Sequence, residues 1–152
     1  MSGAMTIPEY ELIDHTGDVG IIVRAGSLAA LYEKAAAAMF DIILDLETVR
    51  PERPYEVGVE ALDREDLMVR WLSELLFLYE ARRVALSRFD IREVTDSRLA
   101  AKAWGEPFDP GRHIARTELK AVTYHEMLVS EDRSGPGGME GAGWTARIIF
   151  DV

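Results

Sequence analysis

The stretch that decides the fold class is residues 10–44, YELIDHTGDVGIIVRAGSLAALYEKAAAAMFDIIL. Its runs 10–13 and 19–25 are rich in β-branched and large apolar residues, which predicts two strands separated by a polar turn. Ser27 is a good N-cap, and apolar residues then recur at helical spacing. The stretch therefore predicts two strands followed by a helix over about residues 28–44.

Working outward, we expect one more strand and helix and then a β-rich half. Asp63 is the expected N-cap of the second helix, with Asp66 in the place of the capping-box glutamate. The remaining expected elements are a strand over 55–61, a helix over about 64–82, and strands over 84–94, 98–104, 117–130 and 144–150. Strands that cluster in hairpins predict an α+β domain of two layers, a mixed and mostly antiparallel sheet with two helices packed on one face. Residues 1–8 read as a loose leader and 9–152 as a single domain.

The second expected helix has two adjoining apolar stripes. They are Leu67, Trp71, Leu75 and Leu78, and beside them Met68, Leu72, Leu76 and Tyr79. Two stripes indicate a helix that is buried over most of its circumference, or one that exposes an apolar face to a partner. Burial is favoured because apolar faces of small domains mostly pack internally.

Composition excludes several classes of protein. The chain has 152 residues and no cysteine, so a disulfide framework and a thiolate metal site are excluded. It has no apolar run of membrane-spanning length and no secretory signal pattern, which predicts a cytoplasmic protein. Its net charge of −10 weighs against direct nucleic-acid or membrane binding. The same charge permits cation binding and docking onto a basic partner.

The densest polar cluster is the turn 14–18, DHTGD. It begins like a calcium loop, but Val19 and Ala25 stand where an EF-hand needs glycine and glutamate, so an EF-hand is excluded. The turn residues alone favour a backbone-shaping role over a metal site. However, if the last strand pairs near the first hairpin, Asp18, Asp151 and the carboxylate of Val152 converge. Three anionic donors need a cation, a proton or a basic group between them.

Other candidate sites carry less weight. The glycine-rich loop 133–143 lacks the lysine of a phosphate loop, and no nucleophile motif is present. The rigid segment 104–110, WGEPFDP, is more typical of a structural corner than of a ligand platform. Three histidines are too few for a zinc cluster, and His125, expected on a strand, favours a structural role.

In this order the motifs resemble those of the archease family, small proteins found alongside RNA ligases that join tRNA halves. The matching segments are DHTGDVG (14–20), AMFD (38–41), DL (66–67), WLSELL (71–76), WGEPFD (104–109), KAVTYH (120–125) and IFDV (149–152). The resemblance covers about residues 9–152. It departs at Gly17, where alanine is commoner, and it does not support Asp14 as a ligand.

The resemblance implies a function and a site. It implies a non-enzymatic cofactor, or chaperone, of the tRNA-splicing ligase that joins 3′-phosphate or 2′,3′-cyclic phosphate ends to 5′-hydroxyl ends. Such a cofactor promotes guanylylation of the ligase and its repeated turnover. It also implies a divalent metal ion, calcium or manganese, bound by Asp18, Asp151 and Val152, with His15 and His125 as possible outer residues. The oligomeric state stays open.

Two alternatives remain at this point. The same carboxylates could carry a catalytic metal that activates water, which would make the protein a metal-dependent phosphoester hydrolase. Alternatively, the apolar second helix could make it a protein-binding module that needs no metal.

Overall fold

The computed structural model describes residues 8–15, 17–132 and 143–152. The elements in chain order are β1 (Glu11–His15), β2 (Asp18–Ala25), α1 (Leu28–Ile43), the 3-10 helix η1 (Leu46–Thr48), β3 (Arg53–Glu60), α2 (Arg64–Glu80), β4 (Val84–Val94), β5 (Arg98–Pro107), β6 (Ala121–Val122), β7 (Leu128–Asp132) and β8 (Gly143–Asp151). The expected leader and the glycine-rich loop, apart from Pro8 and Gly143, lie outside the described residues.

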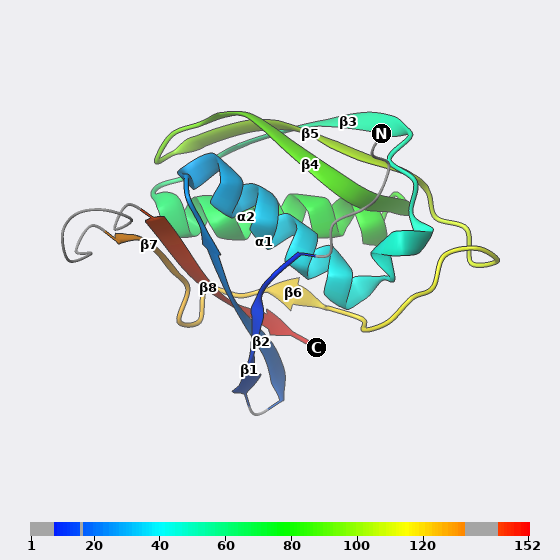
Figure 1. Cartoon of the computed structure of the whole chain (residues 1–152), viewed down its shortest axis with the longest axis horizontal. Helices are drawn as coiled ribbons and strands as arrows, with labels where there is room; N and C mark the ends of the chain where they lie inside the picture. Colours follow the sequence, from blue (N-terminus) through cyan, green and yellow to red (C-terminus); the bar gives the residue numbers. More distant parts are fainter. Residues whose placement is uncertain (1–7, 16, 133–142) are drawn as a thin grey trace.

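The strands form two sheets, and the two helices lie between them (Figure 1). One sheet has the order β1-β2-β8-β6, with β7 also paired to β8, and the other has the order β3-β5-β4. Every pairing between these strands is antiparallel. The α+β class and the antiparallel character are thus confirmed. The structure differs from the expectation in having two sheets around the helices rather than one sheet with both helices on one face.

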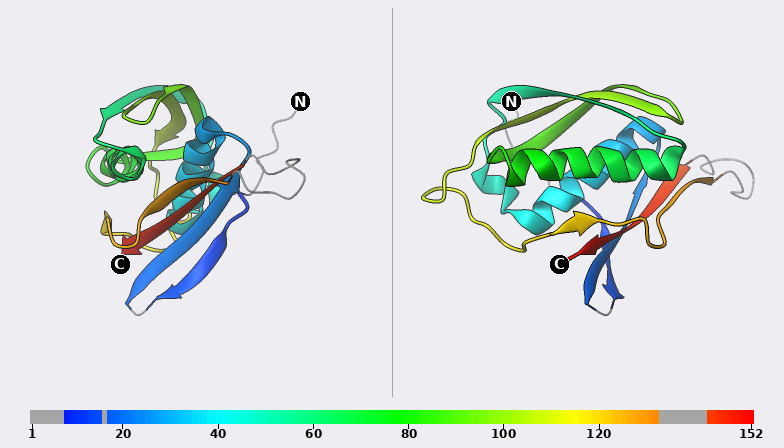
Figure 2. Two further views of the ribbon diagram at one scale, coloured as in Figure 1. Left: turned by 90° about the vertical axis from the view of Figure 1, so that its left-hand side faces the viewer. Right: turned by 180° about the vertical axis from the view of Figure 1, so that it is seen from behind.

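The apolar surface of α2 explains why the helices are covered on both sides. Helix α2 contacts β6 and β7 of one sheet and β3, β4 and β5 of the other, and Figure 2 shows it between the two sheets with one side turned outward. Trp71 is fully buried, and its Nε1 donates to the main-chain oxygen of Tyr32 in α1 at 2.9 Å. The prediction that this helix is buried over most of its circumference is confirmed, so its two apolar stripes are not free for a partner.

The caps of both helices follow the sequence signals. Ser27 Oγ accepts a hydrogen bond from the N–H of Ala30 at 3.1 Å, and Asp63 Oδ1 accepts one from Asp66 at 2.8 Å. A side-chain acceptor at the N-cap satisfies an amide that has no partner within the helix. The local chemistry therefore sets where each helix begins.

The expected strand over 117–130 was wrong in its extent. Only residues 121–122 and 128–132 are strands, and His125 lies in the turn between them rather than on a strand. Glu126 adopts a positive φ of 51°, which is incompatible with an extended strand and bends the chain. Tyr124 is outside both strands, and its hydroxyl donates to Asp66 of α2 at 2.6 Å. This long-range contact is invisible in the local pattern.

Strand β8 connects the first and last parts of the chain. It pairs with the whole of β2, from Ala25 opposite Trp144 to Asp18 opposite Asp151. The β1–β2 hairpin projects beyond the helices, and the C-terminus lies beside it (Figure 1). Residues 18 and 151 therefore meet at one end of this sheet. In the described part of the chain no helix is long and apolar enough to cross a membrane.

Candidate functional site

Four strands meet in one row at this end of the sheet. His15 of β1 is opposite Asp18 of β2, Asp18 is opposite Asp151 of β8, and Asp151 is opposite Ala121 of β6. Residues directly opposite each other on antiparallel strands share a face, with Cβ atoms about 4.5–5.5 Å apart. The condition set by the sequence, that the last strand pairs near the first hairpin, is met.

The main chain holds Asp151 in this row from the β6 side. The N–H of Lys120 donates to the main-chain oxygen of Asp151 at 2.7 Å. Further along, the N–H and the hydroxyl of Thr123 both donate to the main-chain oxygen of Ile149, at 3.1 and 2.9 Å. Segment 120–123 is therefore fixed to the final residues of β8, and the Asp151 side chain remains exposed.

The donor set at this edge fits a hard divalent cation in part. Like charges directly opposite on a sheet repel each other, and an oxygen-loving cation such as calcium or manganese removes that repulsion. No group of three or more His, Cys, Asp or Glu side chains is placed to hold a metal among the described residues. Asp18 and Asp151 would supply two side-chain ligands to such an ion, and further oxygens would have to come from the terminal carboxylate of Val152, the main chain, water or a partner.

The two histidines differ in their relation to this row. His15 is placed in the row by the register of β1 and β2. His125 lies outside it, in the turn after β6, where its N–H is 3.3 Å from Thr123 Oγ1 and its Nε2 is 3.4 Å from Glu126 Oε2. The structure therefore brings residue 15 beside the acidic pair and places His125 on the adjoining turn.

A second cluster surrounds Asp66, the residue expected in the capping box of α2. This carboxylate is only 7% exposed. It accepts hydrogen bonds from the Tyr124 hydroxyl at 2.6 Å, the N–H of Leu62 at 2.9 Å and Arg70 Nε at 3.0 Å. The Tyr124 bond first, then the N–H of Leu62, holds the pKa of Asp66 below its usual range against the opposing effect of burial. The cluster joins α2 to the turn after β6.

A third cluster fixes the corner at the end of β5. Glu106 is buried and accepts from Arg112 Nη2 at 2.6 Å and the N–H of Arg50 at 2.8 Å, and its Oε2 lies 2.7 Å from His113 Nε2. Because His113 Nδ1 accepts the N–H of Asp109 at 2.8 Å, Nε2 carries the proton and donates. Burial raises the pKa of Glu106, but these hydrogen bonds outweigh it and hold the pKa at about 2. This supports the structural reading of segment 104–110.

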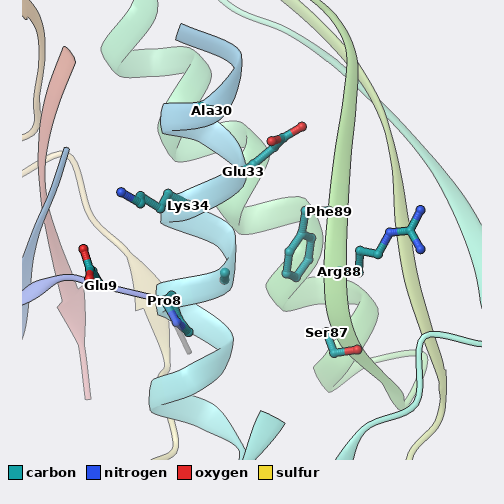
Figure 3. A pocket seen from close by; sticks show the side chains of 9 residues that line it. Pro8, Glu9, Ala30, Glu33, Lys34, Ser87, Arg88 and Phe89 are labelled. Carbon is teal, nitrogen blue, oxygen red and sulfur yellow. The ribbon is translucent and has the colours of Figure 1, made fainter. Parts of the chain in front are cut away.

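A hollow of about 460 Å³ lies between α1, β4 and residues 8–9 (Figure 3). Three of its charged residues, Glu33, Lys34 and Arg88, are engaged, and Arg88 Nη2 donates to Asp90 Oδ2 at 3.0 Å. Glu33 accepts the N–H of Ile91 at 2.8 Å, and Lys34 Nζ donates to the main-chain oxygen of Arg24 at 2.7 Å. The rest of the wall is largely apolar, including two alanines of α1 and the Phe89 ring. Ser87 in the same wall has a buried hydroxyl with no hydrogen-bond partner among the described residues, and no histidine lines the hollow to act as its base.

Comparison with known proteins assigns the family. The model of the Archease protein family matches residues 10–152. This range includes all four residues of the row at the sheet edge, which we call the acidic row: His15, Asp18, Asp151 and Ala121. The chain belongs to the archease family. Relatives include the archease of Sulfurisphaera tokodaii, 38% identical over 122 residues that make up 80% of this chain and 88% of that protein. The archease of Methanosarcina mazei is 34% identical over 148 residues, 95% of this chain and 96% of that one.

Solved structures support the fold of this archease. The solution structure of Methanobacterium thermoautotrophicum protein 1598 is similar with a TM-score of 0.74 at 31% identity, covering 94% of this chain and 98% of that one. The crystal structure of a Thermotoga maritima archease, described as a possible chaperone, has a TM-score of 0.60 at 18% identity. It covers 92% of this chain and 94% of that one, and at this identity it supports the fold alone.

Proposed function

We propose that this archease is a cytoplasmic, non-enzymatic cofactor of the tRNA-splicing RNA ligase that joins 3′-phosphate ends to 5′-hydroxyl ends. It promotes guanylylation of the ligase and multiple turnover. A divalent cation, calcium or manganese, is bound by Asp18, Asp151 and the carboxylate of Val152. His15 and His125 surround these ligands without binding the ion directly. The observation that carries the proposal is the pairing of Asp18 with Asp151 across β2 and β8.

The paired carboxylates support a cation site for an energetic reason. Two negative charges about 5 Å apart repel each other, and a fold that retains them side by side gains from a counter-ion. Asp151 is exposed, so an ion can be reached by a partner as well as by solvent. The bound ion would supply positive charge that orients oxygen ligands of the partner.

The overall charge supports a protein partner over RNA. With a net charge of −10, the chain repels phosphate backbones and is attracted to a basic enzyme that binds RNA. A cofactor of this kind acts through a difference in affinity for two states of its partner. The archease therefore needs contacts that favour the activated ligase over its resting state.

The test is multiple-turnover RNA ligation by the partner ligase with GTP and manganese, with and without this archease. We expect wild type to raise turnover, and Asp18→Asn and Asp151→Asn to lose the effect while remaining folded. Glu93→Gln, which removes one exposed carboxylate on β4, is the matched control and should act as wild type. A variant extended by one residue beyond Val152 tests the terminal carboxylate separately.

Three results would contradict the proposal in whole or in part. If wild type leaves the turnover of an active ligase unchanged, the cofactor role is refuted. If the purified archease alone hydrolyses phosphoesters and Asp18→Asn abolishes that activity, the carboxylates serve a hydrolase instead. If both aspartate variants stimulate the ligase as wild type does, the metal site is refuted and the cofactor role stands.

A further inference from the structure

The Asp66 carboxylate accepts hydrogen bonds from three residues whose side chains are exposed. Leu62, which precedes α2, is 88% exposed, and Tyr124, in the turn after β6, is 60% exposed. Arg70, one turn further along α2, is also exposed. Tyr124 and Leu62 are bound to the two different oxygens of the Asp66 carboxylate, and Arg70 shares the second oxygen with Leu62. One buried carboxylate therefore fixes the side chains of Tyr124 and Arg70 and the main chain of Leu62 at neighbouring positions on the surface.

Helix formation does not require this arrangement. Asp63 already caps α2 by accepting the N–H of Asp66. Burying a carboxylate is costly unless several donors bind it, and here the three donors come from residues whose side chains face solvent. The hydrogen bonds order the Tyr124 side chain, the Arg70 guanidinium and the main chain that carries Leu62. Ordering such groups before binding lowers the entropy cost of an interface, and tyrosine and arginine are enriched among residues that dominate binding energy.

The cluster lies close to the acidic row. Tyr124 follows Ala121 by three residues, and three residues of extended chain span at most about 10 Å. Ala121 is directly opposite Asp151, about 5 Å away. The Tyr124 backbone is therefore within about 15 Å of Asp151. A standard interface covers about 800 Å² on each partner, which is wide enough to include both features.

We infer that Leu62, Tyr124 and Arg70 form a docking surface for a basic protein partner, which is the RNA ligase of the proposed function on which this inference rests. The surface presents an apolar centre, Leu62 and Tyr124, to an apolar recess of the partner. The acidic row and the acidic side chains near α2 face the partner's basic rim. In this arrangement docking brings the partner to the edge that holds Asp18 and Asp151.

Charge supports a basic partner at this surface rather than an acidic one. The hydrogen bond to Asp66 first, then partial burial and the carboxylates of Asp66 and Asp63, raise the pKa of Tyr124, with Arg70 opposing them. Glu126 follows Tyr124 by two residues, and Glu65 accepts the N–H of Val129 at 3.1 Å. Arg147 Nε donates to the main-chain oxygen of Glu126 at 3.0 Å, so the carboxylates of Asp63, Glu65, Asp66 and Glu126 outnumber the guanidiniums of Arg70 and Arg147 among these groups.

The test measures binding of the purified ligase to the full-length archease by calorimetry or fluorescence anisotropy, with manganese binding measured in parallel. The docking variant is Leu62→Ser combined with Tyr124→Ala, which leaves Asp18, Asp151 and Asp66 in place. We expect ligase binding to weaken at least about 10-fold, because two central side chains are removed. Manganese affinity should stay within about two-fold of wild type.

The matched control is Ile114→Ser, which also removes an exposed apolar side chain. Its neighbour Ala115 lines a hollow with Tyr79 and Glu80 at the far end of α2, about 24 Å along that helix from Leu62. This variant should bind the ligase as wild type does. A second variant, Tyr124→Phe, removes only the hydrogen bond to Asp66 and should give a smaller loss of two- to five-fold.

Failure of this inference is distinguishable from failure of the proposed function. If wild type binds and stimulates the ligase but the double variant binds equally well, the docking surface is refuted and the cofactor role stands. If Ile114→Ser weakens binding as much as the double variant does, the effect is not specific and the surface is again refuted. If wild type does not bind the ligase at all, both proposals fall.

Discussion

Replacing Asp151 with asparagine should raise the free energy of unfolding when no divalent cation is present and lower it when one is bound. The partner carboxylate of Asp18 lies across the β2–β8 pair. Two unit charges about 5 Å apart interact with about 0.8 kcal/mol in water and about 3 kcal/mol at an effective dielectric constant of 20. Because Asp151 is exposed, we take a value near the lower figure, about 1 kcal/mol. Asp151→Asn should therefore be more stable than wild type in a chelator.

A bound cation reverses this order. An ion at 100 times its dissociation constant stabilises the native state by about 2.7 kcal/mol. For a domain of this size, 1 kcal/mol shifts Tm by roughly 2–4 °C. Wild type should gain about 5–11 °C on addition of manganese or calcium, whereas Asp151→Asn should gain a small part of that. Asp151→Asn should thus have the higher Tm in the chelator, and wild type the higher Tm with manganese or calcium.

The assay is thermal unfolding followed by circular dichroism, in EDTA and in a manganese series, at constant ionic strength. Glu93→Gln is the control, because it removes one exposed charge outside the row. Equal manganese shifts in wild type and Asp151→Asn would refute the argument that the acidic pair binds the ion. A loss of stability for Asp151→Asn in EDTA would show that the pair is not repulsive, and would refute the electrostatic premise itself.

Two further predictions concern the corner after β5 and the sheet that contains it. The pKa of Glu106 is about 2, below the ordinary value of 4.5, so its contribution of about 3 kcal/mol is complete above pH 4.5 and is lost as the pH falls toward 2. Glu106→Gln should have a lower free energy of unfolding than wild type at pH 7. Urea unfolding should show that the difference between the two proteins is smaller at pH 3. A difference that stays the same at both pH values would contradict this prediction. A Cβ at Gly105 would overlap the main-chain oxygen of Ala85, so Gly105→Ala should lose about 3 kcal/mol or more in urea unfolding. Gly58→Ala, whose Cβ would meet its nearest neighbouring atom at 3.9 Å, should be neutral or gain about 0.5 kcal/mol, and equal losses at both sites would refute the steric reasoning.

Local signals were sufficient for most elements and insufficient for their assembly. Ser27 and Asp63 predict where the two helices begin, because capping depends on residues within one turn. The division into two sheets depends instead on which strands pair, and β2 pairs with β8 from the far end of the sequence. No periodicity within either strand carries that information. The turn at Glu126 escaped prediction because apolar and β-branched residues on both sides of it favour a strand.

The candidate site divides in the same way. The turn residues alone indicated a backbone role for Asp18, and the convergence with Asp151 was only conditional on a pairing that the structure provides. The ligand role of these residues stays a prediction. Asp66 was assigned to a capping box, and its amide does bond to Asp63. Its carboxylate accepts from Leu62 and Arg70 nearby and also from Tyr124, 58 residues away, and a contact at that separation leaves no local sequence signal.

The short strand β6 links the two proposed surfaces mechanically. It has two residues, and its register with β8 places Ala121 opposite Asp151. On one side of β6, Lys120 bonds to the main chain of Asp151, and on the other side Tyr124 bonds to Asp66. A partner that binds at Tyr124 therefore contacts a segment that is hydrogen-bonded to the end of β8, which carries Asp151. If both proposals hold, ligase and cation should bind with positive coupling, and by reciprocity manganese should tighten ligase binding by the same factor as the ligase tightens manganese binding. Tyr124→Phe should reduce that shared factor without removing either ligand's own binding.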